Sequence, residues 1–224
     1  MSAQAPTTTV AEPAASNEGY FLLNRLGSVL AVAPLGAWTV VHIWNNLAVY
    51  RGPTAWQNAV TGYEHPYGSF AISLIVLLPL LFHTVWGIGR LAKSRPNNGR
   101  YGYFDNLRYM LQRLAALGVL AFLGAHLWLA FLHPRFVEGA PENFADIAHE
   151  MHFNGPTLPV YLLGTLGVAY HLGNGIASLG MGWGLTASKK GMQRWQLFGI
   201  ALFVLLWVMS WGAIYGLYQA GATL

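Results

Sequence analysis

Four histidines lie inside apolar stretches of this 224-residue chain. They are His42 in "WTVVHIW", His83 in "PLLFHTVWGIG", His126 in "GAHLWLA" and His171 in "VAYHLGNG". An ionisable side chain is costly to place in hydrocarbon, so a histidine there is a candidate for moving a proton or binding a metal. The neutral imidazole is a common metal ligand. These four residues are therefore the first candidates for chemistry.

Long apolar runs surround the histidines. The chain is 54% hydrophobic and 9% charged, whereas soluble domains are about 25% charged. A helix needs roughly 20 apolar residues to cross about 30 Å of hydrocarbon, and lipid offers the backbone no other hydrogen-bonding partner. The sequence predicts an all-α integral membrane protein with five transmembrane helices, at about 22–50, 68–92, 108–133, 157–182 and 195–220.

The N-terminal residues 1–18 differ in composition from the rest of the chain. They are small, polar and proline-containing, without the basic start and apolar core of a signal peptide. We expect 1–18 to be a disordered tail and 19–224 to be one membrane domain. The chain contains no cysteine, which excludes disulfides, thiolate metal sites and iron–sulfur clusters built by this chain alone. The net charge of +4 does not indicate a nucleic-acid partner, because the basic residues lie in short loops between apolar runs.

The connections between the predicted helices differ in charge. The second carries Arg90, Lys93, Arg95, Arg100 and Arg108, and the fourth carries Lys189, Lys190 and Arg194. The third carries Glu138, Glu142, Asp146 and Glu150, with Arg135 as its basic residue. Basic loops stay in the cytoplasm. The N-terminus is therefore expected in the cytoplasm and the C-terminus outside.

The histidines fall at two depths in this arrangement. His42 and His126 lie about eight and seven residues from the outer ends of their helices, which is roughly 10–12 Å at 1.5 Å per residue. His83 and His171 lie about nine and eleven residues from the inner ends, which is roughly 13–17 Å. Depth therefore pairs His42 with His126 and His83 with His171, and the fifth helix contributes no histidine.

Two imidazoles at one depth on different helices match the ligation of a haem b by two histidines. We therefore expect the first four helices to form a haem-binding bundle. The face formed by Gly164, Gly167, His171 and Gly175 would let a porphyrin approach the backbone, and Trp38, Trp44, Trp86 and Trp128 could flank it. A single intramembrane histidine is about as often a packing residue, but four at matched depths favour ligation. Zinc is disfavoured because no carboxylate lies in mid-span.

Several segments around these histidines resemble a known family. The segments "RLGSVLAVAPLGAWTVVH", "PLLFHTVWG", "YGYF…LQR…AHLW" and "YHLGNG…WGLT" are similar to the diheme cytochrome b membrane subunit of succinate dehydrogenases and fumarate reductases. The resemblance extends from about Tyr20 to Tyr218 and is greatest to the single-chain, five-helix, menaquinone-linked type.

The resemblance implies a cofactor set, partners and a location. It assigns a proximal haem b to His83 and His171 and a distal haem b to His42 and His126. It implies flavoprotein and iron–sulfur subunits on the cytoplasmic face, menaquinone as substrate, and a cytoplasmic membrane in a prokaryote. Succinate oxidation would belong to the partners, and this chain would supply the anchor, the electron path and the quinone site. A higher oligomer of the complex is compatible with this interpretation.

Further residues are weaker candidates. Ser28 matches a family position near a proximal propionate, and Arg25 and Arg113 could bind propionates, although either arginine could simply be a positive-inside anchor. Tyr63, Glu64 and His65 are candidates for the quinone site near the distal pair, with a solvated loop as the alternative.

Two other functions remain open at this stage. A diheme cytochrome b of another dehydrogenase, such as a hydrogenase or formate dehydrogenase, would use the same chemistry with different partners. A haem-free channel or transporter lined by histidines would be colourless.

Overall fold

The computed structural model describes residues 19, 25–62, 66–95 and 99–224. Throughout these ranges the chain forms helices and connections, without a strand. The all-α class expected from the sequence is confirmed. The predicted tail, 1–18, lies outside the described residues, as do the quinone candidates Tyr63, Glu64 and His65.

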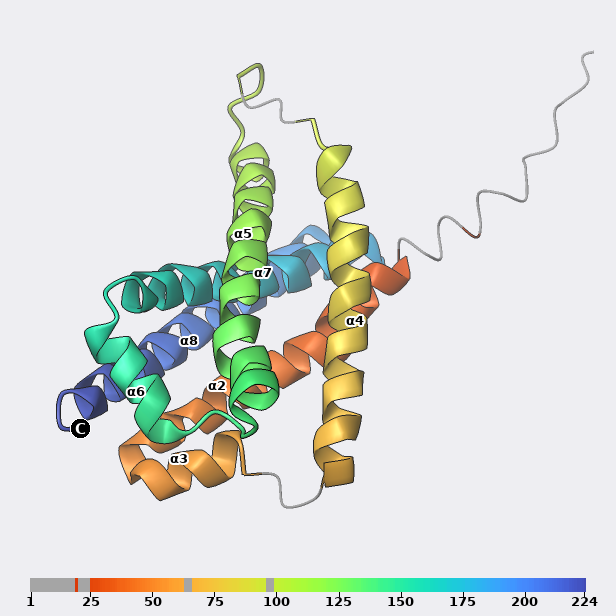
Figure 1. Ribbon diagram of the computed structural model, residues 1–224. Helices are drawn as coiled ribbons and strands as arrows, with labels where there is room; N and C mark the ends of the chain where they lie inside the picture. Colours follow the sequence, from red (N-terminus) through yellow and green to blue (C-terminus); the bar gives the residue numbers. More distant parts are fainter. Residues whose placement is uncertain (1–18, 20–24, 63–65, 96–98) are drawn as a thin grey trace, which may run out of the picture.

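Within the described residues, five long helices form the body of the molecule, and Figure 1 shows how they are arranged. The first is Arg25–Arg51, which contains α2 (Ala37–Asn46). The others are α4 (Pro66–Ala92), α5 (Phe104–Leu127, continuing to Glu138), α7 (Thr157–Gly182) and α8 (Lys189–Gly221). These segments correspond to the five predicted ones, although α5 and α8 begin several residues earlier than expected. The added first turns contain charged residues, namely Asp105 in α5 and Lys189, Lys190 and Arg194 in α8. The search for apolar runs had excluded these turns.

Four of these helices are long and apolar enough to cross a membrane, counted over the described residues. They are Arg25–Arg51, Phe70–Ala92 within α4, Phe104–Glu138 and Lys189–Gly221. The helix α7 is not among them, because Tyr161, His171 and Asn174 lower its hydropathy. With 26 residues it is long enough to span. Its crossing of the membrane stays a prediction.

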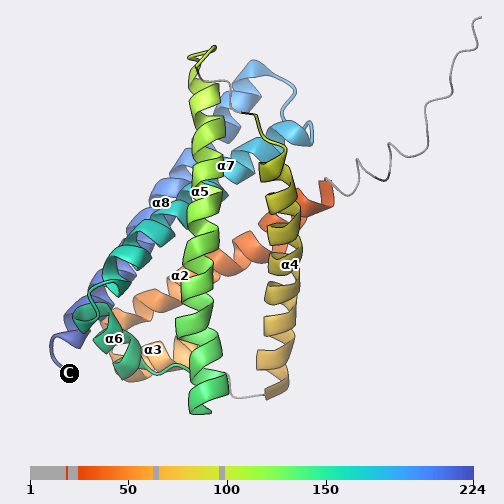
Figure 2. The same cartoon turned by 45° about the horizontal axis from the view of Figure 1, so that its top comes forward.

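The helix α7 packs between α5 and α8 (Figures 1 and 2). Many of its residues are buried, among them Tyr161, Ala169 and Ala177. Close approach to α8 depends on Gly173, where a Cβ would lie 2.5 Å from the backbone oxygen of Gly199. Tyr161 is buried, and His171 and Asn174 contact Gln112 of α5. These polar residues of α7 therefore face protein, which explains how a helix of modest hydropathy fits this bundle.

Two short helices were not predicted. They are α3 (Pro53–Val60) and α6 (Phe144–Phe153). Trp56 of α3 packs edge-on against Phe144 of α6, with ring centres 5.7 Å apart. The Gln57 side chain donates to the Glu142 backbone oxygen at 3.1 Å and accepts from the Phe144 backbone nitrogen at 2.9 Å. Together α3 and α6 cover one end of the bundle.

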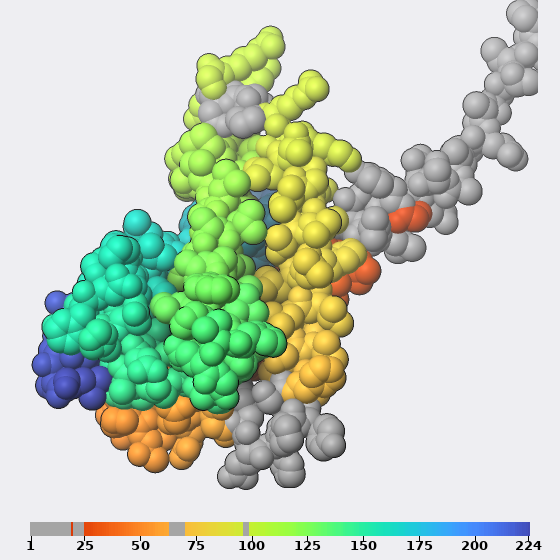
Figure 3. All heavy atoms as spheres, in the orientation of Figure 1, coloured from red at the N-terminus to blue at the C-terminus, as the bar shows by residue number. Residues whose placement is uncertain are grey.

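The two ends of the molecule differ in charge. We call the end with α3, α6 and the segment Glu138–Glu150 the acidic end. The opposite end, where α4 ends, α5 begins and α7 connects to α8, is the basic end. The helix α4 lies at the periphery, and its contacts are mainly with the stretch Ala31–Gly36 of the first helix. Many of its apolar side chains are exposed, among them Phe70, Ile75 and Leu78. In the space-filling view α4 stands beside α5 (Figure 3).

Candidate functional site

One large cavity runs between the first helix, α4, α5 and α7. Its volume is about 1180 Å³, which exceeds the roughly 300–1,000 Å³ of ordinary small-molecule pockets. All four intramembrane histidines line it, namely His42, His83, His126 and His171. The walls are otherwise largely aliphatic and aromatic, as a large flat apolar ligand requires.

The histidines meet across this cavity in two pairs. The ring centres of His83 and His171 are 6.1 Å apart, and the two rings are inclined by 67°. Those of His42 and His126 are 5.9 Å apart and inclined by 66°. A metal–imidazole bond is about 2 Å long, so two rings on opposite sides of one ion would have centres about 6 Å apart. The structure thus brings together the same pairs that depth predicts.

The donor set fits haem better than a bare ion. No group of three or more histidine, aspartate or glutamate side chains could hold a metal ion within the described part of the chain. A porphyrin supplies four nitrogens of its own, so haem iron needs only two axial ligands from the protein. Unpartnered polar atoms also line the cavity: Trp86 Nε1 and Arg113 Nε are buried without a hydrogen-bond partner. Both are donors that an acidic group of a ligand would satisfy.

Backbone and side-chain groups orient three of the imidazoles. His83 Nδ1 lies 3.2 Å from the Gly27 backbone oxygen. A carbonyl only accepts, so this contact places the ring proton on Nδ1 and leaves Nε2 available as a ligand. His126 Nδ1 lies 3.1 Å from the Tyr161 hydroxyl, which can act in either direction. His171 Nδ1 lies 3.1 Å from the Gln112 side-chain nitrogen.

The three polar residues suggested as propionate partners also line the cavity. Ser28, Arg25 and Arg113 all contribute to its wall. The Ser28 hydroxyl donates to the Arg25 backbone oxygen at 2.8 Å and accepts from Trp183 Nε1 at 3.4 Å. The Arg113 guanidinium lies 3.2 Å from the Tyr109 ring centre. Their roles toward a cofactor stay predictions.

Two expectations about the cavity wall were partly wrong. Trp38 and Trp86 line the cavity, but Trp44 and Trp128 are 67% and 56% exposed and lie outside the lining. Helical periodicity alone did not decide which face of each helix turns inward. On α7, Gly164 packs against α5, since a Cβ there would overlap the Phe122 ring. That end of the glycine face is a helix contact, and Gly175 further along the helix reaches the cavity.

Glu142 is a buried acid that the sequence did not single out. It lines the acidic end of the cavity and is 7% exposed. Burial, reinforced by the carboxylates of Asp146, Glu138 and Glu150 and opposed by Arg135, raises the pKa of Glu142 to about 7. This carboxyl can therefore exchange protons near neutral pH, at the end of the cavity that holds His42 and His126.

The chain has sequence similarity to a known protein. No family model matches the chain. The chain is 28% identical over 196 residues to the succinate dehydrogenase cytochrome b558 subunit of Bacillus subtilis (strain 168), and the alignment covers 87% of this chain and 96% of that subunit. Over most of its length the chain is therefore similar to a succinate dehydrogenase cytochrome b subunit. The resemblance inferred from the segments around the four histidines is thereby confirmed. Since the alignment spans nearly all of both proteins, the relationship concerns the whole membrane domain rather than an isolated motif.

Proposed function

We propose that this chain is the membrane anchor and electron-transfer subunit of a succinate dehydrogenase, and that it binds two haems b and delivers electrons to menaquinone. One observation carries the proposal: four histidines line one cavity and face each other in two pairs. The ring centres are 5.9 Å apart in the His42/His126 pair and 6.1 Å apart in the His83/His171 pair. His83 and His171 would hold the haem nearer the basic end, and His42 and His126 the other. Bound in this way, haem supplies reversible one-electron transfer.

The residues of the chain have distinct tasks in this proposal. Gly27 and Tyr161 orient His83 and His126 through the ring nitrogens that do not face iron. The apolar walls exclude water, and Arg25 and Arg113 at the basic end offer positive charge to propionates. Glu142 at the acidic end holds an exchangeable proton for a quinone site there, with Tyr63, Glu64 and His65 as further candidates.

The partners follow from what the chain lacks. It contains no cysteine, so an iron–sulfur cluster must belong to another subunit. We place the flavoprotein and iron–sulfur subunits at the basic end, facing the cytoplasm, because basic loops favour that side. Electrons would then reach the His83/His171 haem first and the His42/His126 haem second.

The purified complex tests the proposal through its haem content and spectra. We expect two low-spin haems b per chain by haem assay and by EPR of the oxidised state. His83→Ala should remove one spectral component and His42→Ala a different one. A ratio near one haem per chain, a dominant high-spin signal, or loss of the same component in both variants would refute it.

The electron path has a separate test. In the His83→Ala variant, succinate should no longer reduce the remaining haem, whereas dithionite should still reduce it. If succinate still reduced that haem at the normal rate, the proposed order of transfer would be wrong.

A further inference from the structure

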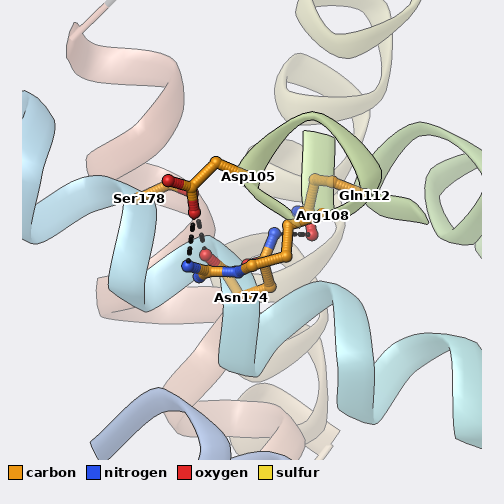
Figure 4. Close-up of polar contacts among 5 residues, drawn as sticks. All are labelled: Asp105, Arg108, Gln112, Asn174 and Ser178. Atoms are coloured by element: carbon orange, nitrogen blue, oxygen red, sulfur yellow. Dashed lines mark hydrogen bonds and ion pairs between the residues drawn. The ribbon is translucent and has the colours of Figure 1, made fainter. Parts of the chain in front are cut away.

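A chain of polar side chains connects His171 to the basic end. Gln112 of α5 places its side-chain nitrogen 3.1 Å from His171 Nδ1 and 3.0 Å from the His171 backbone oxygen. The Asn174 amide nitrogen donates to the Gln112 side-chain oxygen at 2.8 Å, and Arg108 Nη2 donates to the Asn174 side-chain oxygen at 2.8 Å. Arg108 Nη1 lies 3.5 Å from Asp105, which is exposed. Figure 4 shows Asp105, Arg108, Gln112 and Asn174 between α5 and α7.

Arg108 at one end and the His171 backbone oxygen, which only accepts, at the other fix the direction of the hydrogen bonds between them. A guanidinium has only donors, so the Asn174 side chain must turn its oxygen toward Arg108. The Asn174 NH₂ group then faces Gln112, whose side-chain oxygen must accept the hydrogen bond. Gln112 is left with its NH₂ group facing His171. Ser178 does not disturb the order, since it donates to the Asn174 backbone oxygen at 2.9 Å.

This direction sets His171 apart from its pair partner. His83 Nδ1 faces a carbonyl oxygen at 3.2 Å, which accepts a proton. His171 Nδ1 faces an amide NH₂ at 3.1 Å, which only donates. A neutral imidazole that binds iron through Nε2 carries its proton on Nδ1. As the chain of amides stands, it opposes the form of His171 that would bind iron.

We propose that Gln112 is a positioning residue for His171, and that Arg108, acting through Asn174, and the His171 backbone oxygen together hold the Gln112 amide with its NH₂ group toward Nδ1. The inference rests on the proposed haem at His83 and His171. As an iron ligand, His171 would then lack an acceptor for its Nδ1 proton, whereas His83 has the Gly27 oxygen. Arg108 also lies 3.5 Å from Asp105, so the placement of Gln112 is coupled to a charged pair at the basic end.

The proposal predicts the sign of a potential change. A ligating imidazole that donates a hydrogen bond is more basic and stabilises ferric iron. Arg108→Leu releases Asn174 and weakens the hold on the Gln112 amide. It should lower the midpoint potential of the His83/His171 haem, but by less than a variant that puts an acceptor beside Nδ1, because the His171 oxygen still accepts from the Gln112 NH₂ group. Gln112→Glu offers only acceptors and should act in the same direction. We expect roughly a tenfold change in the redox equilibrium, which is about 59 mV for one electron.

The test is a spectroelectrochemical titration of the purified complex, with EPR of the oxidised haems. The His83/His171 haem is identified as the component that His83→Ala removes. Gln112→Leu should shift the EPR signal of this haem, because the ring loses the contacts that fix its orientation. The His42/His126 haem should not change in any of these variants. Gln193→Leu, on the exposed side of α8, is the matched control and should leave both potentials unchanged.

The outcomes distinguish failure of the Gln112 inference from failure of the proposed haem function. If Arg108→Leu and Gln112→Glu lower thermal stability without moving the potential, the side chains are structural only and the inference is wrong. Equal shifts of both haems would also overturn it. If Gln112→Leu fails to assemble, Arg108→Leu carries the test alone, since it leaves Gln112 in place. A complex without any haem that depends on His83 would overturn the proposed function as well.

Discussion

Protonation of Glu142 should make the stability of the acidic end depend on pH. The side chain is 7% exposed, and burial together with Asp146, Glu138 and Glu150 raises its pKa from 4.5 to about 7 in the folded protein. The folded state therefore binds this proton more tightly than the unfolded state. The stabilisation is complete below pH 4.5 and is lost as the pH rises through about 7.

The size of the effect follows from the shift. At 1.36 kcal/mol for each pH unit, raising the pKa from 4.5 to about 7 corresponds to about 3 kcal/mol. Arg135 already offsets part of the burial, and solvent screens the exposed carboxylates of Glu138 and Asp146, so we expect about 1–2 kcal/mol in practice. For a chain of this length that is a change in Tm of about 2–8 °C.

Thermal unfolding of the purified complex between pH 5 and pH 8 measures the effect. The Tm of the wild type should fall across this range, whereas Glu142→Gln should remove most of the slope and raise the Tm at pH 8. Glu138→Gln is the control, because Glu138 is an exposed acid of the same segment, and most of the slope should remain. A wild-type Tm that does not fall, or an equal slope in Glu142→Gln, would show that the carboxyl is hydrated and ionised throughout.

Three further predictions concern packing, ligation and topology. Gly173→Ala should destabilise the α7–α8 contact by about 1–3 kcal/mol, because the new Cβ would lie 2.5 Å from the Gly199 oxygen. Gly89→Ala, where a Cβ meets nothing within 4 Å, should not lower the Tm. Tyr161→Phe removes the partner of His126 Nδ1 and should weaken haem binding at the His42/His126 pair by about 10–100-fold, with the other haem retained in the difference spectrum. A protease site in the connection between α4 and α5 should be cut only from the cytoplasmic side of sealed vesicles, and cutting from outside would invert the proposed orientation.

The short helices show where the search for apolar runs fails. α3 and α6 are eight and ten residues long, too short to appear as membrane segments. Their start signals were nevertheless present in the sequence. Pro53 stands at the first position of α3, and the Asn143 side chain accepts from the Asp146 backbone nitrogen at the start of α6. Capping patterns would have found both helices, whereas hydropathy could not.

The residues around His171 were missed for a different reason. Arg108 reads as one of several basic loop residues, and Gln112 and Asn174 read as isolated polar positions in two separate helices. Their common function depends on how α5 and α7 approach each other, since Arg108 and Asn174 are 66 positions apart and Gln112 and His171 are 59 apart. A single sequence contains no local signal for contacts of this kind.

The sequence by itself determined the membrane class, the long helices and the pairing of the histidines. These follow from properties of individual segments, because apolar length fixes a span and the rise per residue fixes the depth of a side chain within it. Tertiary structure alone decided which faces turn inward: Trp86 lines the cavity while Trp44 is exposed, and Glu142 is buried although it lies within a charged connection. Burial of a side chain and the partner of a polar group depend on the rotation and crossing of neighbouring helices. Hydrophobic periodicity does not determine this rotation or crossing, because helices of this chain are apolar on most faces.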